Sequence, residues 1–233
     1  MTAAGVREPR GARRGQGALA SGPLPARTAG ALRLVWLHLV SRRVPAALAG
    51  LAACAAGMRA GLAWGWVQGS GAGAQQVPLL LEAGTASVIA VTTYSPFGEP
   101  ERATGRWLPW LRLGISVALT GAAIGMLAAG AAAARLPDGT LAIVRNVAGI
   151  TGIGLLSAAI IGGALAWIAP MAYTVVAEFA LLEGWTTPWT WPGRPPHDRG
   201  AAICAAVVFA AGVAVVTARG GRDWVHADGG GAG

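Results

Sequence analysis

Two carboxylates, Glu99 and Glu101, stand in a short polar passage between long apolar segments, and paired carboxylates can act as general acid and general base. The passage provides no apolar pocket that would shield them from water, so catalysis there is not expected. The three histidines, His38, His197 and His226, are far apart in the sequence, and the two cysteines lie singly in apolar segments. These residues predict no metal site, no catalytic triad and no cofactor.

The identity of the basic residues excludes two further kinds of catalytic site. The sequence has 18 of them, and all are arginine. A Walker A loop needs a lysine for the nucleotide phosphates, and Schiff-base catalysis needs an amine. Any ATP-driven function therefore requires a second protein. The net charge of +8 is interpreted as arginines beside anionic lipid, and no nucleic-acid partner is expected.

Four charged residues stand inside apolar segments, where charges are costly in lipid and normally pair or face a cavity. They are Arg59, Glu82, Arg145 and Glu178. If the segments alternate in direction across a membrane, all four lie at a similar depth near the external side. The pattern predicts an intramembrane layer of ion pairs that closes this side of a helix bundle. The alternative is that the two arginines extend separately to the lipid headgroups.

The composition defines the elements that must hold these residues. The chain is 54% hydrophobic and 12% charged, with a mean hydropathy of +0.53, whereas soluble domains carry about 25% charged residues. Runs of Ala, Val, Leu and Gly approach the length of a membrane-spanning helix. The sequence predicts an all-α, polytopic membrane helical bundle rather than a soluble helical protein.

Six transmembrane helices are expected, preceded by an amphipathic helix at residues 31–43 that lies on the membrane surface. Alternatively, residues 31–43 are the beginning of the first span. The expected spans cover residues 44–66, 77–95, 111–134, 141–161, 164–182 and 200–218. Gly162 and Gly163 separate the fourth span from the fifth; the alternative is one bent helix with a re-entrant piece.

Arginines near span ends stay on the cytoplasmic side of a membrane. Most arginines fall on one side if the N-terminus is inside, so both termini are expected in the cytoplasm of a multi-pass cell-membrane protein. The expected organisation is a disordered tail at 1–30, a six-span domain at 31–220 and a flexible tail at 221–233. The loop at 96–109 is then cytoplasmic, and the loop at 183–199 is external.

Both loops contain candidate contact residues. The cytoplasmic loop has charged and aromatic side chains that suit docking on a protein, with a plain connector as the alternative: Phe97, Glu99, Glu101, Arg102 and Arg106. The external loop is expected to sit at headgroup level through its tryptophans, with a gate or substrate contact as the alternative: Trp185, Trp189 and Trp191.

Small residues at helical spacing let membrane helices approach closely. Gly121 and Gly125 form a GxxxG pattern in the third expected span. Gly152 and Gly154 belong to a series of small residues in the fourth. Tight helix packing is therefore predicted.

Four short motifs carry a family resemblance: SPFGEPER at 95–102, RNVAGITG at 145–152, AWIAP at 166–170 and WTWP at 189–192. With the predicted layout, the chain resembles the permease subunits of ABC-2 type exporters. In particular, it is similar to small six-span membrane proteins of high-GC bacteria that are labelled ABC transporter permeases. The resemblance covers about residues 31–220.

This resemblance implies a permease subunit without catalytic residues of its own, driven by a separately encoded ABC-type ATPase. The interfacial helix and the loop after the second span would contact that ATPase. Two permease chains, as a homodimer or a related pair, would form the transport path. The loop at 183–199 is shorter than the re-entrant helices of such exporters require. The competing interpretations are a non-transporting membrane scaffold and an intramembrane enzyme.

Overall fold

Helices form most of the described chain. The computed structural model describes residues 43–65, 72–92, 108–132 and 139–219, all within one compact unit, Val40–Gly233. The elements are α2 (Val44–Ala63), α3 (Ala72–Thr92), α5 (Leu108–Ala132), α6 (Gly139–Ile161), η2 (Gly163–Leu165), α7 (Ile168–Glu183), η3 (Trp191–Gly193) and α8 (Arg199–Arg219). No strand occurs among these described residues, so the all-α prediction is confirmed for them.

Five segments of the described chain are long and apolar enough to cross a membrane. They are α2, Pro109–Ala132 of α5, α6, Gly163–Glu183 (η2 with α7) and α8. These segments indicate a multi-pass membrane protein. The helix α3 has 21 residues and lies at the second predicted span, but it is not among the five. Its polar side chains, which include Gln75, Gln76 and Glu82, make it less apolar than the others.

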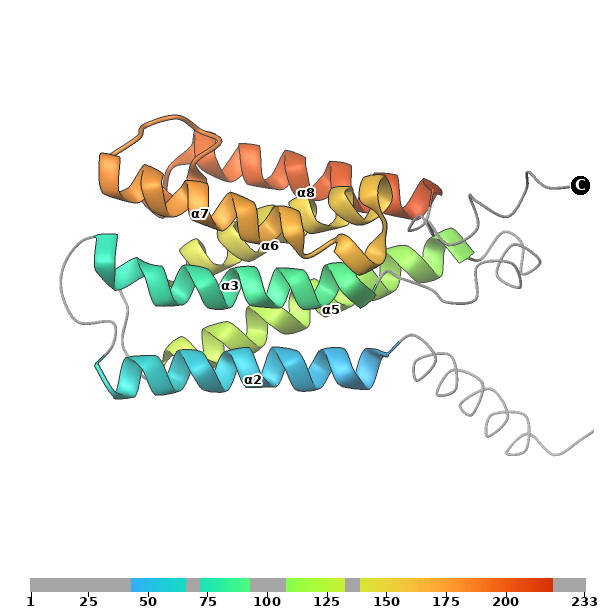
Figure 1. The fold of residues 1–233 in the computed structure, drawn as a ribbon, viewed down its shortest axis with the longest axis horizontal. Coiled ribbons are helices and arrows are strands. Elements are labelled where there is room, and N and C mark those ends of the chain that lie inside the picture. The colour runs from blue at the N-terminus through green and yellow to red at the C-terminus, as the bar shows by residue number, and fades with distance from the viewer. Residues whose placement is uncertain (1–42, 66–71, 93–107, 133–138, 220–233) are drawn as a thin grey trace, which may run out of the picture. The chain divides into compact units, whose positions relative to one another are not determined.

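The helix α6 is central. It packs against α3, α5, α7 and α8, whereas α2 packs against α3 and α5 (Figure 1). In the apolar stretch of α6 that is long enough to cross a membrane, 72% of the residues are buried in the protein. The corresponding share for α2 is 22%. The outer helices expose large apolar side chains, which a lipid environment accepts. Polar groups on α6 are thereby kept away from lipid.

The predicted tight packing is observed between α6 and α8. A Cβ atom added at Gly152 would lie 2.6 Å from backbone atoms of Phe209, and one at Gly212 would lie 2.5 Å from the carbonyl oxygen of Gly152. The two helices therefore cross backbone against backbone. Gly121 and Gly125 are different, because a Cβ atom at either position would meet nothing within 4 Å. Their GxxxG pattern is not used in packing between the described helices.

The predicted break between the fourth and fifth helices is confirmed. Gly162 has φ 94° and ψ 154°, a conformation essentially restricted to glycine. The chain then passes through η2 into α7, which packs against α6. This segment is therefore two helices rather than one bent helix. Gly184, with φ 68°, ends α7 in the left-handed conformation typical of helix ends. It begins the connection called here the α7–α8 loop, residues 184–198.

Helix boundaries differ from the predicted spans by a few residues. Pro109, assigned to a loop in the sequence, lies in the first turn of α5, where a missing N–H costs little. The predicted interfacial helix at 31–43 lies outside the described residues except for Arg43, and the tails at 1–30 and 221–233 lie entirely outside them.

Candidate functional site

A buried polar network lies near the N-terminal end of α6, where Arg145 and Asn146 follow one another. These two residues are 6% and 7% exposed, and Glu82 of α3 is 2% exposed. An unpaired polar group in an apolar membrane environment costs several kcal/mol. The three side chains therefore need partners, and the structure provides them.

Asn146 connects the other members of the network. Its Nδ2 donates to Oε2 of Glu82 at 3.0 Å, and its Oδ1 accepts a hydrogen bond from Nε of Arg145 at 3.3 Å. The Arg145 guanidinium also reaches the α7–α8 loop. There Nη1 donates to the carbonyl oxygen of Pro195 at 2.8 Å, and Nη2 donates to that of Arg194 at 3.0 Å. The network thus joins α3, α6 and the loop.

Arg145 and Glu82 interact through the amide rather than as a direct ion pair. A direct ion pair is seen nearby between Arg194 and Asp198. Because Asn146 stands between the charges of the network, the guanidinium can satisfy two loop carbonyls. The available chemistry is hydrogen bonding, together with proton binding at the Glu82 carboxyl. The network contains no hydroxyl, thiol or amine that could act as a nucleophile.

Aromatic contacts also fix the α7–α8 loop. Trp191 is 2% exposed and packs on small residues of α8, including Ala205. A Cβ atom at Gly149 of α6 would lie 2.6 Å from the Trp191 ring. Tyr173 of α7 contacts the same ring, with the centroids 4.8 Å apart. The Tyr173 hydroxyl donates to the carbonyl oxygen of Trp189 at 2.8 Å. The loop is thus anchored to α6, α7 and α8.

Asp198 connects the loop to the start of α8. Its Oδ1 accepts the backbone N–H of Ala201 at 2.9 Å, as in a helix N-cap, and its Oδ2 accepts Nε of Arg194 at 2.8 Å. The Ala201 N–H, and then the Arg194 guanidinium, hold the pKa of the Asp198 carboxyl below its ordinary value.

This lowered pKa gives a pH-dependent prediction. Ionised Asp198 stabilises the fold above its ordinary pKa, and the contribution is lost as the pH falls through the lowered value. We expect Asp198→Asn to flatten the fall in thermal midpoint between about pH 6 and about pH 3, because the amide keeps the cap acceptor but does not titrate. Asp198→Ala should also lower the midpoint at neutral pH. Parallel pH profiles for the wild type and Asp198→Asn would contradict this role.

The structure brings together two of the four residues in the predicted charge layer. Glu82 and Arg145 join through Asn146, an uncharged residue that the charge pattern does not include. Arg59 of α2 is exposed, and Glu178 of α7 is half-buried. Within the described residues, neither has a hydrogen bond or ion pair to the network. What is observed is one carboxylate, one amide and one guanidinium.

The three tryptophans predicted at the membrane interface differ in their exposure. Trp185 and Trp189 are 42% and 45% exposed, with ring centroids 6.0 Å apart. Trp191 is instead 2% exposed and lies against α6 and α8. Gly149 leaves room for its ring. The small residues of α6 were the available signal, but the sequence does not indicate which tryptophan fills the space.

The remaining predicted site lies outside the described residues. It comprises the proposed ATPase contacts Phe97, Glu99, Glu101, Arg102 and Arg106. Across the ranges that are described, no three His, Cys, Asp or Glu side chains gather in a way that could hold a metal ion.

Comparison with known proteins identifies no relative. No protein-family model matches the chain, and searches of curated proteins and of solved structures give no match. The function must therefore be inferred from the fold and from the polar network.

Proposed function

We propose that this chain is the membrane-spanning permease subunit of an ATP-driven exporter of the ABC-2 type, acting in the cell membrane with a separately encoded ATPase. The observation that carries the proposal is the buried network of Glu82, Asn146 and Arg145 inside an apolar bundle. Charged groups are expensive in a membrane and are kept there mainly where they serve a function. Because the sequence contains no lysine, a Walker A loop must belong to a partner.

Six spans suit this function, with α3 as the second. Its 21 residues would extend about 32 Å, close to the thickness of the hydrocarbon core. Its polar residues Glu82 and Thr85 are buried against protein rather than exposed to lipid. An interfacial helix at 31–43 would precede α2.

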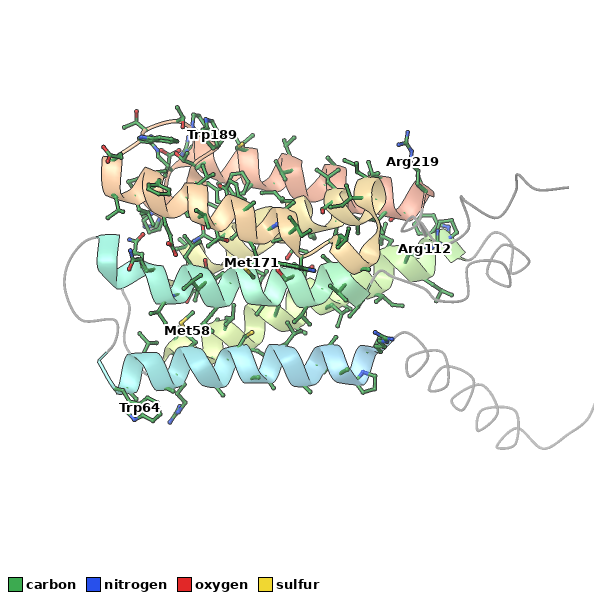
Figure 2. All side chains as sticks on the ribbon, in the orientation of Figure 1. Met58, Trp64, Arg112, Met171, Trp189 and Arg219 are labelled. Carbon is green, nitrogen blue, oxygen red and sulfur yellow. The ribbon has the colours of Figure 1, made fainter. Side chains whose placement is uncertain are left out.

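We assign the cytoplasmic side to the end of the bundle that carries Arg112 and Arg219. Figure 2 shows these arginines at one end and Trp64 and Trp189 at the opposite end. Arginines near span ends remain in the cytoplasm, whereas tryptophans occur at both interfaces. Both termini would then be cytoplasmic, and the α7–α8 loop would be external.

The transport path would lie between two permease chains, as a homodimer or a related pair. Within one chain, Gly152 and Gly212 bring α6 and α8 into backbone contact. That contact leaves no space for a substrate between these two helices. A path between chains would allow each bundle to remain closely packed while the two move relative to each other.

The proposal predicts that an ATPase co-purifies with this chain. A tagged chain extracted from its host in mild detergent should recover a protein with Walker A and signature motifs. The double variant Glu99→Arg with Glu101→Arg should lower that recovery at least about tenfold, because like charges would oppose the partner surface. Glu99→Gln with Glu101→Gln is the matched uncharged control. Membrane levels of the chain should be normal in both variants.

Two outcomes would count against this interpretation. Undiminished recovery with the arginine variant would make the loop a simple connector. Absence of any ATPase from the wild-type preparation would remove the main support for a permease.

A non-transporting scaffold is the second candidate, and the close packing of α6 on α8 favours it. One measurement separates the two functions. In proteoliposomes, a permease should stimulate ATP hydrolysis by its partner, whereas a scaffold should bind its partner and leave hydrolysis unchanged.

A further inference from the structure

We propose that Arg145 is a latch that holds the α7–α8 loop against the helix bundle, and that Asn146 couples this latch to Glu82 of α3. The proposal goes beyond the transport function and does not require it. It assigns to the network the control of how firmly this loop is held.

The loop depends on Arg145 for its hydrogen bonds to α6. Its backbone hydrogen bonds are mostly local, such as Gly193 N–H to the Thr190 carbonyl at 3.0 Å and Asp198 N–H to the Pro195 carbonyl at 3.0 Å. Among the described hydrogen bonds between this loop and α6, both come from the Arg145 guanidinium. Removing those donors would take away both of these hydrogen bonds between the loop and α6.

The geometry of the latch requires arginine. A planar guanidinium can donate to two successive carbonyls and still present Nε to Asn146. Lysine keeps the positive charge but places it at one atom, so it cannot make the same set of bonds. The Arg145 site therefore depends on the shape of the side chain as well as on its charge.

Asn146 transmits the position of Glu82 to the latch. Its Nδ2 donates to Oε2 of Glu82, so its Oδ1 is turned toward Nε of Arg145. If α3 shifts relative to α6, or if the Glu82 acceptor is removed, the amide is free to rotate. The Arg145 side chain then loses one of the contacts that orient it, and the loop is released more often.

A thiol at position 190 can report loop opening. Thr190 is fully buried in the α7–α8 loop, one residue before Trp191, and cysteine is close to threonine in size. The chain has two native cysteines, so Thr190→Cys would be placed in a Cys54→Ala, Cys204→Ala background. The rate of reaction with a membrane-impermeant maleimide measures how often this part of the loop becomes accessible.

With the latch intact, the thiol at position 190 should react slowly. Arg145→Lys should raise the labelling rate at least about tenfold, because the paired bonds to the carbonyls are lost. Asn146→Leu and Glu82→Leu should each raise it by a similar factor. Glu82→Gln, the matched control, keeps an acceptor for Asn146 and should stay within about twofold of the reference.

Each result decides one part of the proposal. Unchanged labelling in Arg145→Lys overturns the latch. Faster labelling in Arg145→Lys, with unchanged labelling in Asn146→Leu and Glu82→Leu, overturns the coupling to α3. Size-exclusion elution checks that each variant is folded. If the leucine variants do not fold, Asn146→Gln displaces the amide by one methylene and should give the same acceleration. The assay uses no ATPase, so its outcome is independent of the proposed transport function.

Discussion

Replacing Gly152 with alanine is expected to lower the free energy of unfolding by about 2 kcal/mol. The added methyl carbon would lie 2.6 Å from both Cα and N of Phe209. These are backbone atoms, so α8 must move away from α6 to make room. The better helix propensity of alanine offsets at most about 1 kcal/mol of this loss. The measurement is equilibrium unfolding in mixed micelles of mild detergent and dodecyl sulfate.

Gly125→Ala is the matched control for this substitution. It makes the same chemical change within a long apolar helix, but the new Cβ atom would meet nothing within 4 Å. We expect no loss of stability, and a gain of up to about 1 kcal/mol from helix propensity. Equal losses at Gly125 and Gly152 would contradict the distinction between the α6–α8 crossing and the open face of α5.

Replacing Glu82 with arginine is expected to prevent most of the protein from folding in the membrane. The new guanidinium would be buried close to Arg145, whose donors already occupy the nearby loop carbonyls. An uncompensated buried charge costs about 3–5 kcal/mol, a large share of the stability of a typical domain. The amount of monodisperse protein recovered as a fluorescent fusion measures the effect. Glu82→Gln should be recovered at nearly the wild-type level.

A charge swap distinguishes the observed network from a direct ion pair. Glu82→Arg combined with Arg145→Glu would restore opposite charges across α3 and α6. It would also place a carboxylate against the carbonyls of Arg194 and Pro195, where the structure requires donors. We therefore expect the swap to fail. Recovery of the double variant would show that charge pairing alone maintains this site.

Much of the fold follows from local sequence signals. Apolar runs indicate where the helices lie. Gly162 indicates the break between α6 and α7, because its φ of 94° is accessible to few other residues. The helix α3 is harder to classify, since Glu82 lowers its hydropathy and is acceptable there only because α6 covers it. Some membrane helices carry polar residues that neighbouring helices bury. From sequence alone, such a helix cannot be told apart from one that does not cross the membrane.

The site was only partly predictable, because its contacts are distant in sequence. The cost of charge in lipid drew attention to Glu82 and Arg145, which the structure joins through Asn146. Nothing local indicates that Asn146, 64 residues from Glu82, would join them. Trp191 likewise looks like its exposed neighbours until Gly149, on another helix, is seen to make room for its ring. Which side chains meet across two helices depends on how those helices pack. The sequence of one segment alone does not determine that packing.

The partners of Arg145 have a consequence for biosynthesis. They are the carbonyls of residues 49 and 50 positions further along the chain. On the ribosome, α6 is therefore complete well before Arg194 and Pro195 exist, while it carries a guanidinium on an otherwise uncharged helix. The insertion machinery or α3 must hold α6 until the α7–α8 loop emerges. A nascent chain that stalls before Arg194 leaves the two Nη donors of Arg145 without their carbonyl partners. Membrane quality control could recognise that difference from the finished protein.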